Sequence, residues 1–465
     1  MKVVAIDIGS TWTKGAAFAV AGDEVELLAR AARPTTVANL ADAFFEVLQA
    51  VAADDALGCI RRGELQLHYS SSAKGGLAVA ALGLVPEVTL EIGKLAAQSA
   101  GAKLTQVFAY RLTRADLARL EAAPPDILLF AGGTDGGNTR YVLANAEAIA
   151  ASALDCEIIY AGNRDVADEV AAALAGKRLT LAANLLPAFN EPDPEPARGA
   201  IRAVFLRAIV RGKGLDRIVE ATGVEPLPTP YAMLDYAEAI RTQVPGWEAF
   251  ILLDVGGATT DVYSACDSTV EPGVVVRGLP EPAVRRTVEG DIGLRVSAAV
   301  TAQAEAVMLD AALARAGLSA EVFAKAAQRR AASPETLADS EAERRVDIAL
   351  AGLCVAQACE RHAGRHQPVH TPEGEVRVQT GRNLRTVGKV IGSGGWLGRQ
   401  ADFDPRPWLT ERVLDARGRA VLLPRRFEYY RDEDNLFPLL ANLARACPHA
   451  AARAGVARLK RIFGE

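Results

Sequence analysis

The sequence lacks any strong excess of charge and any long apolar run. Its 52 lysines and arginines are nearly balanced by 57 aspartates and glutamates, which leaves a formal net charge of −5 over 465 residues. Charges this even, spread along the chain, give no electrostatic reason to expect a nucleic-acid or membrane partner. No apolar segment approaches the roughly 20 residues that a bilayer-spanning helix needs. We therefore expect a protein that binds neither nucleic acid nor membrane.

Paired cysteines and a secretion signal are also lacking. The six cysteines are widely spaced, and the first residues lead into only a short apolar strand. The expected compartment is therefore the reducing cytoplasm. Cys354, Cys359, His362 and His366 are close in sequence, but their spacing does not match a zinc signature. A charged helix with apolar cysteines on its inner face explains them better.

Two common nucleotide-binding signatures are missing as well. No Walker P-loop occurs anywhere in the chain. Gly392-x-Gly394 begins like a dinucleotide motif, but its sixth position is Leu397. A nucleotide site would therefore have to be built in another way.

What is present is one pattern used twice. An apolar strand runs into Asp-x-Gly, small and hydroxyl residues form a turn, and a second strand follows; the two copies are Asp7-x-Gly9-Ser10-Thr11 and Asp254-x-Gly256-Gly257-Ala258-Thr259-Thr260-Asp261. The glycines allow backbone amides to approach a phosphate without a Cβ in the way. One copy alone could be a simple hairpin with a glycine turn. Two copies with matching carboxylates favour two halves that share a ligand.

The region between the two copies has a rhythm of its own. Strands are predicted at residues 126–131, 157–161 and 178–183, with helices at 141–154 and 165–174, which is a βαβαβ unit of parallel sheet. Its first loop, Gly132-Gly133-Thr134-Asp135-Gly136-Gly137-Asn138, is unusually rich in glycine. This loop could bind an anion or a partner, or it could simply need several positive-φ residues. The proline-rich residues 187–196 are the best candidate for a linker.

The three turns resemble the motifs of the actin, sugar-kinase and heat-shock chaperone ATPase superfamily. The copies at Asp7 and Asp254 are similar to its first and second phosphate motifs, and Val390-Ile391-Gly392-Ser393-Gly394-Gly395-Trp396 is similar to its adenosine motif. The resemblance implies an α/β fold of two ribonuclease-H-like lobes with ATP and Mg²⁺ in the cleft. At 465 residues the chain exceeds the roughly 250–300 at which one core stops growing, which agrees with two lobes.

On this resemblance we expect four regions. Residues 1–72 form the N-terminal part of the first lobe, and residues 73–246 form an α/β elaboration or inserted partner-binding region. Residues 247–400 form the second lobe, and residues 401–465 pack back on the lobes.

The same resemblance assigns roles to residues. Asp7 and Asp254 would hold Mg²⁺ mainly through its water molecules, because this hard ion gives up water reluctantly. Asp261, or a hydroxyl of Thr259 or Thr260, would orient the attacking water. Lys14 would neutralise phosphate charge, although an exposed strand position explains it equally well. The residues expected to contact ATP are Gly9, Ser10, Thr11, Lys14, Gly256, Gly257, Thr259, Thr260, Gly392, Gly394 and Gly395.

Within the superfamily, the whole chain resembles the MutL/GlmL family of accessory proteins for adenosylcobalamin-dependent glutamate (methylaspartate) mutase. The phrases at residues 131–138, 253–261 and 288–293 carry this resemblance. It implies a weak ATPase that releases damaged cobalamin from the mutase subunits. None of the five histidines lies in an Asp-x-His-x-x-Gly pattern, so the partner would hold the cobalamin. The alternatives are a small-molecule kinase of the same fold and an actin-like scaffold protein.

Overall fold

The computed structural model describes residues 1–36, 38–52, 55–72, 77–210, 214–279, 281–372 and 374–463. The chain forms two compact units. Unit 1 comprises Met1–Tyr236 and Pro438–Ala451, and unit 2 comprises Ala237–Phe437 and Ala452–Glu465. The C-terminal region therefore contributes to both units.

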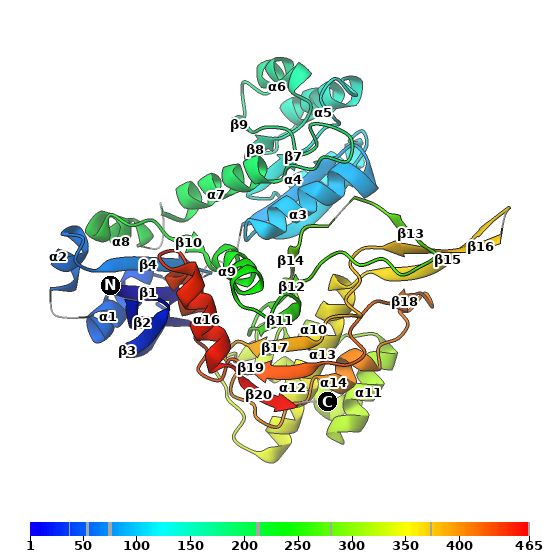
Figure 1. The fold of residues 1–465 in the computed structure, drawn as a ribbon. Coiled ribbons are helices and arrows are strands. Elements are labelled where there is room, and N and C mark those ends of the chain that lie inside the picture. Colours follow the sequence, from blue (N-terminus) through cyan, green and yellow to red (C-terminus); the bar gives the residue numbers. More distant parts are fainter. Residues whose placement is uncertain are drawn as a thin grey trace. The chain divides into compact units, whose positions relative to one another are not determined.

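Unit 1 is built on a five-stranded sheet in the order β3-β2-β1-β4-β10 (Figure 1). The first three strands are antiparallel, and β4 and β10 run parallel to β1. Apolar residues at helical spacing bury one face of α1, which packs on β1, β2 and β3. The elements are β1 (Lys2–Ile8), β2 (Trp12–Ala21), β3 (Glu24–Pro34), α1 (Leu40–Val51), α2 (Ala56–Arg61), β4 (Gln66–Ser71), α8 (Leu215–Thr222), β10 (Leu227–Pro228) and α9 (Thr229–Gln243), which continues into unit 2 from Ala237 onward.

A second sheet in unit 1 is wholly parallel, in the order β6-β5-β7-β8-β9. The predicted βαβαβ pattern is confirmed as β7-α5-β8-α6-β9, and two further strands precede it. The elements are β5 (Ala78–Gly83), the π-helical turn η1 (Pro86–Leu90), α3 (Glu91–Ser99), β6 (Lys103–Ala109), α4 (Arg114–Ala122), β7 (Ile127–Phe130), α5 (Arg140–Ala151), β8 (Glu157–Tyr160), the 3₁₀ turn η2 (Arg164–Val166), α6 (Ala167–Ala173), β9 (Arg178–Leu181) and α7 (Glu195–Val210).

The proline-rich residues 187–196 join β9 to α7 and are irregular for most of their length. Both β9 and α7 belong to unit 1, so this segment does not separate the two units.

Unit 2 repeats the topology of the first sheet. Its strands lie in the order β14-β12-β11-β17-β19-β20, where the first three are antiparallel and β17 and β19 run parallel to β11. The sheet strands are β11 (Phe250–Val255), β12 (Thr260–Ala265), β14 (Val284–Glu289), β17 (Lys389–Ser393), β19 (Glu428–Arg431) and β20 (Lys460–Phe463). The last of these, β20, pairs antiparallel with β19 at the edge of the sheet.

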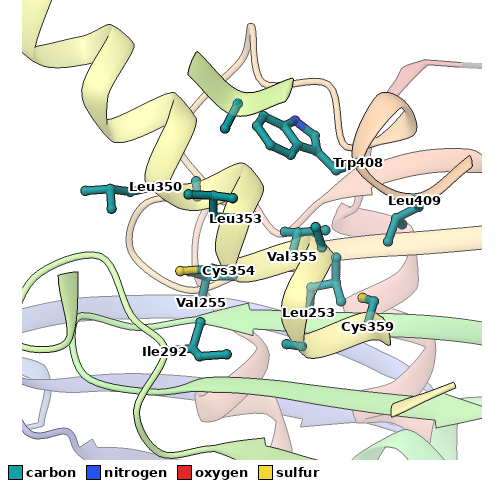
Figure 2. Packing of buried hydrophobic residues seen from close by; sticks show 14 of the residues in the cluster. Leu253, Val255, Ile292, Leu350, Leu353, Cys354, Val355, Cys359, Trp408 and Leu409 are labelled. Atoms are coloured by element: carbon teal, nitrogen blue, oxygen red, sulfur yellow. The ribbon is translucent and has the colours of Figure 1, made fainter. Parts of the chain in front are cut away.

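Helix α13 forms the centre of the core of unit 2. Figure 2 shows Leu350, Leu353 and Cys354 of this helix among the buried residues that pack with Leu253 and Val255 of β11. The helices are α10 (Ala298–Thr301), α11 (Ala306–Ala316), α12 (Ala320–Ala332), α13 (Glu341–His362), α14 (Arg406–Thr410), α15 (Phe437–Leu443) and α16 (Pro448–Arg458), the last two of which lie partly or largely in unit 1. A smaller sheet in the order β13-β16-β15-β18 contains β13 (Val274–Arg277), β15 (Arg365–Thr371), β16 (Gly374–Thr380) and β18 (Ala420–Val421).

The two central sheets thus share one plan, with strands in the order 3-2-1-4-5 and the fourth and fifth parallel to the first. The fold is α/β, with two ribonuclease-H-like lobes and an additional α/β elaboration in the first half of the chain. In the part of the chain that the structure describes, none of the helices combines the length and apolar character that crossing a membrane requires.

Candidate functional site

Asp7 lies near the carboxyl end of the central strand of unit 1. In register, it is opposite Lys14 on β2 and Ser70 on β4. Its Oδ1 accepts hydrogen bonds from Ser70 Oγ at 3.1 Å and from Thr229 Oγ1 at 2.7 Å. Ser70 is the second-to-last residue of the parallel strand β4 and lies beside Asp7. Thr229 follows β10 and had no local signal, because its hydrogen bond to Asp7 joins residues 222 positions apart in the sequence.

The buried position of Asp7 controls its charge. Burial raises the pKa of this carboxyl above its ordinary value, and Lys14, Thr229 and Ser70 partly oppose that change. The carboxylate therefore lies where an additional cation would lower its free energy. This placement favours Lys14 as a charge partner of the site over an unrelated exposed strand residue.

A second layer of side chains holds Ser70 in place. Asn442 on α15 donates from Nδ2 to Ser70 Oγ at 2.7 Å and to the Ile6 carbonyl oxygen at 3.1 Å. The side chain of Asn442 is fully buried. A residue from the C-terminal part of the chain thus orients the hydroxyl that binds Asp7, and sequence reasoning had no means of finding it.

The turn after Asp7 is tight and exposed. The Gly9 amide donates to the Trp12 carbonyl at 3.1 Å, and Thr35 Oγ1 donates to the Gly9 carbonyl at 2.8 Å. Ser10 and Thr11 at its tip are exposed to solvent. The predicted phosphate contacts Gly9, Ser10 and Thr11 therefore share one accessible turn.

Asp254 occupies the matching position in unit 2. It lies on the central strand β11, opposite Asp261 on β12 and Ser393 on β17. The two units therefore repeat an aspartate next to a serine on the fourth strand. Ser393 Oγ donates to Asp432 Oδ2 at 3.0 Å, and Asp432 follows the fifth strand as Thr229 does in unit 1.

The segment that follows β14 holds the turn between β11 and β12 through backbone hydrogen bonds. The Gly256 amide donates to the Thr259 carbonyl at 2.9 Å, and the Arg295 amide donates to the Gly257 carbonyl at 2.8 Å. Thr259 is partly exposed, whereas Thr260 is fully buried and donates from Oγ1 to the Ile292 carbonyl at 3.0 Å. Of the two predicted hydroxyls, Thr259 is thus the one that remains accessible.

Asp261 is held by a buried arginine. Arg286 Nε on β14 donates to Asp261 Oδ1 at 2.7 Å, and the guanidinium is almost completely shielded from solvent. Burial raises the pKa of the Tyr263 phenol well above its ordinary range, and the negative charge of Asp261 adds to this effect. The Asp261 carboxylate therefore has a fixed orientation on the same strand pair as Asp254.

The third turn begins later than the motif suggested. Gly392 lies within β17, and a Cβ added there would lie 2.1 Å from the Tyr429 hydroxyl, so its absence makes room for a core side chain. Gly394 has a φ of +88°, and a Cβ there would lie 2.6 Å from Asp254 Oδ1. Gly395 has open space around it. The turn at Gly394 and Gly395 therefore adjoins the carboxylate of the second phosphate-type turn.

The residues at both turns fit a nucleotide with Mg²⁺. Carboxylate oxygens are the protein ligands that Mg²⁺ prefers, and glycine turns expose amides that suit phosphate oxygens. Within the described ranges, no group of three or more His, Cys, Asp or Glu side chains is placed to hold a metal ion. Each of Asp7 and Asp254 offers one carboxylate, and their role toward Mg²⁺ stays a prediction.

Sequence comparison decides the family. A family model described as MutL protein matches residues 3–457, and the protein MutL of Clostridium tetanomorphum is 36% identical over 390 residues, covering 82% of this chain and 83% of that protein. The chain belongs to the MutL family. All residues predicted to form the site lie inside the stretch that matches MutL.

Solved structures similar to this MutL-family chain include three proteins that align over nearly all of it. Diol dehydratase-reactivating factor in nucleotide-free form shows 12% identity with a TM-score of 0.32 and covers 98% of this chain and 99% of its own. A carbohydrate kinase from Novosphingobium aromaticivorans shows 14% identity with a TM-score of 0.32, covering 99% and 93%. Xylulose kinase from Bifidobacterium adolescentis shows 10% with a TM-score of 0.31, covering 100% and 95%. These low scores add nothing to the assignment of function.

Proposed function

We propose that this MutL-family chain binds ATP with Mg²⁺, hydrolyses it slowly, and serves as an accessory protein that releases damaged cobalamin from adenosylcobalamin-dependent glutamate mutase. The observation that supports nucleotide binding is the repeated arrangement of an aspartate beside a strand-end serine, Asp7 with Ser70 and Asp254 with Ser393. Glycine turns follow both aspartates. The mutase as client rests on the resemblance of the whole chain to its family.

The proposed roles follow from the contacts of each residue. Asp7 and Asp254 would accept hydrogen bonds from the water shell of Mg²⁺, which supplies charge neutralisation to the phosphates when bound. The amides of the two turns would bind phosphate oxygens. Asp261, fixed by Arg286, or the accessible hydroxyl of Thr259 would orient the attacking water.

The first test concerns ATP hydrolysis. Asp254→Ala should lower the hydrolysis rate by roughly 10²-fold or more, because such a preorganised electrostatic contact commonly contributes about that much. Asp310→Ala is the matched control, since Asp310 lies exposed on α11. Hydrolysis is measured by phosphate release and folding by circular dichroism. An unchanged rate in a folded Asp254→Ala protein would remove this residue from the site.

The second test concerns the client. Purified protein is incubated with inactivated glutamate mutase, ATP, Mg²⁺ and fresh adenosylcobalamin, and mutase activity is followed over time. Recovery that requires hydrolysable ATP and is lost in Asp254→Ala supports the proposal. Stoichiometric consumption of ATP by a sugar or an organic acid, without recovery of the mutase, would instead identify a small-molecule kinase. ATP-dependent assembly into filaments, without recovery, would identify a scaffold.

A further inference from the structure

Unit 1 contains a pocket that belongs to neither phosphate-type turn. Its volume is about 840 Å³, and its walls are the end of α2, the first half of β4, the end of α8 with the residues after it, and the segment after α15. The lining residues that matter most are Arg61, Leu67, His68, Glu220, Val224 and Arg445. Helices α2 and α8, which both contribute to its walls, contact each other and are neighbours in Figure 1.

The short strand β10 helps to explain why the pocket exists. β10 pairs with β4 only at Ser70 and Ser71. In the described ranges, residues 66–68 of β4 therefore have no strand neighbour on that side, and they line the pocket instead. The Tyr69 hydroxyl donates to the Val224 carbonyl at 2.9 Å, which fixes the wall formed by the residues after α8.

His68 brings an unsatisfied polar group to this pocket. Both of its ring nitrogens are shielded from solvent, and neither has a hydrogen-bond partner among the residues that the structure describes. Burial, together with the positive charge of Arg445, lowers the pKa of His68 to about 4, so the ring is neutral at physiological pH. A neutral imidazole still carries one N–H, and a shielded donor without an acceptor costs about 1–3 kcal/mol. The ring thus lacks an acceptor.

Positive charge is available at the same place. Within the described part of the chain, the Arg445 guanidinium makes no hydrogen bond or salt bridge, although the charges of Arg202 and Asp235 act on it from a distance. Arg61 donates a hydrogen bond from Nε to the Ala221 carbonyl oxygen at 3.1 Å, which fixes its guanidinium at the wall of the pocket. Against these two arginines, Glu220 is the one acidic residue among the described residues of the lining.

We propose that this pocket is a second ligand site, which binds a small organic anion through Arg445, Arg61 and the ring N–H of His68. An anionic oxygen accepts hydrogen bonds from guanidinium and imidazole together, so one group satisfies both unpaired donors. Apolar lining residues such as Leu67 and Val224 suit the carbon part of the molecule. The anionic group is a carboxylate or a phosphate, since both present the same acceptor oxygens.

Histidine ring signals give a direct test in the full chain. The protein has only five histidines, so a ¹H–¹⁵N spectrum of the imidazoles is simple, and His68→Phe assigns the signal of His68. Succinate and inorganic phosphate are titrated separately, each with and without saturating ADP and Mg²⁺. We expect at least one of the two anions to shift the His68 signal, and by the same amount with ADP and Mg²⁺ as without them. The anion that binds more tightly shows whether the site takes carboxylates or phosphates.

Variants at the pocket separate this site from nonspecific binding. Arg445→Gln should weaken the anion at least tenfold, and Arg445→Lys should recover part of that loss. Arg62→Gln is the matched control. Arg62 follows the pocket residue Arg61 in the sequence, but its guanidinium is already paired with Glu64 and Asp55. Melting curves confirm that each variant is folded, and calorimetric titration of His68→Phe provides a second route if Arg445→Gln is unstable.

Three results would overturn the proposal. The first is a His68 signal that neither anion moves. The second is anion affinity in folded Arg445→Gln equal to that of the parent protein. The third is loss of anion binding when ADP and Mg²⁺ are added, which would place the anion at the nucleotide site. None of these results depends on ATP hydrolysis, so failure here is distinct from failure of the proposed function.

Discussion

At the scale of single residues, Asp7 shows the conflict between stability and function. A carboxylate that is taken out of water loses its hydration, and two hydroxyls with Lys14 replace that hydration only in part. The pKa of Asp7 is accordingly raised from 3.8. The folded state therefore binds the proton more tightly than the unfolded state does. The contribution of Asp7 to stability falls as the pH rises from about 3.8 through the folded pKa, and the cost is fully present above it.

Asp7→Asn should therefore be at least as stable as the parent protein at pH 7, because the amide cannot ionise and still accepts from Ser70 and Thr229. Its advantage should shrink as the pH falls through the raised pKa of Asp7 toward about 3.8, while ATP hydrolysis is lost at every pH. Urea unfolding at pH 4 and pH 7 measures this, with Asp42→Asn on the exposed side of α1 as the control. A clear loss of stability in Asp7→Asn at pH 7 would show that the carboxylate is not strained by burial.

Gly394 and Gly395 offer a matched pair in one turn. At Gly394 the backbone has a φ of +88°, and a Cβ would meet Asp254 Oδ1 at 2.6 Å and the Val255 carbonyl oxygen at 2.9 Å. An L-residue pays about 1–2 kcal/mol for a left-handed backbone, before any clash is counted. Gly394→Ala should thus destabilise the protein by about 2 kcal/mol or more and weaken ATP binding by displacing Asp254.

Gly395→Ala, by contrast, meets no atom within 4 Å. It should leave the unfolding midpoint nearly unchanged. Denaturant unfolding and nucleotide titration of the two variants make the comparison. Equal behaviour of the two would mean that the turn at Gly394 adjusts freely, contrary to its close approach to Asp254.

At the scale of elements, α13 fixes the second phosphate-type turn through one buried carboxylate. Asp347 accepts from both terminal nitrogens of Arg295, at 3.0 and 2.8 Å, and from Arg330 Nε at 2.7 Å. Arg295 in turn bonds through its amide to the carbonyl of Gly257. The helix therefore holds the turn through Arg295, whose side chain contacts Asp347 and whose backbone amide contacts Gly257.

Asp347→Ala should lower the free energy of unfolding by about 3 kcal/mol, because two shielded guanidinium groups lose a carboxylate partner, although Arg330 keeps its pair with Glu343. It should also weaken ATP binding, since Arg295 no longer braces Gly257. The control is Arg329→Ala, which removes the exposed pair with Glu343 and should cost less than about 1 kcal/mol. Similar losses in the two variants would contradict a bracing role for Asp347.

Elements with a clear period could be predicted from the sequence, whereas those with mixed composition could not. The hairpins after Asp7 and Asp254 and the β7-α5-β8-α6-β9 run have apolar strands bounded by turn residues, and all of them form. The strand β5 is Ala-Val-Ala-Ala-Leu-Gly, and alanine does not favour a strand over a helix, so it gave no signal. Ser70 needed the register of β4 with β1, and Asn442 needed the position of α15, neither of which a local pattern contains.

At the scale of the whole molecule, the repeated sheet topology explains why the sequence was informative about the site. Two copies of an Asp-x-Gly strand end implied two related lobes, and the structure supplies them with the same strand order. The partners of each aspartate differ between copies, Lys14 in one and Asp261 in the other. A duplicated backbone thus provides two similar turns, while the side chains around them are set separately in each unit.

The division of the chain into units gives the last prediction. Unit 1 includes residues 438–451, which come from the C-terminal part of the sequence. In this segment Asn442 donates to the Ile6 carbonyl and to the Ser70 hydroxyl, and the Ala451 carbonyl accepts from the Tyr236 hydroxyl at 3.0 Å. The segment also carries the fully buried Leu439, Leu440 and Leu443, each worth about 2 kcal/mol when shielded from water. Losing it removes a large share of the roughly 5–15 kcal/mol that stabilises a typical domain.

A protein truncated to residues 1–236 should therefore melt at a much lower temperature than the full chain and expose apolar surface to a dye. Adding a synthetic peptide of residues 438–451 should restore part of the melting temperature, because the peptide brings back both the leucines and Asn442. The same peptide with Asn442→Leu keeps the apolar surface and should restore less, since the Ile6 carbonyl and Ser70 hydroxyl stay unpaired. If the truncated protein melted as the full chain does, the Asn442 contacts would contribute nothing to unit 1.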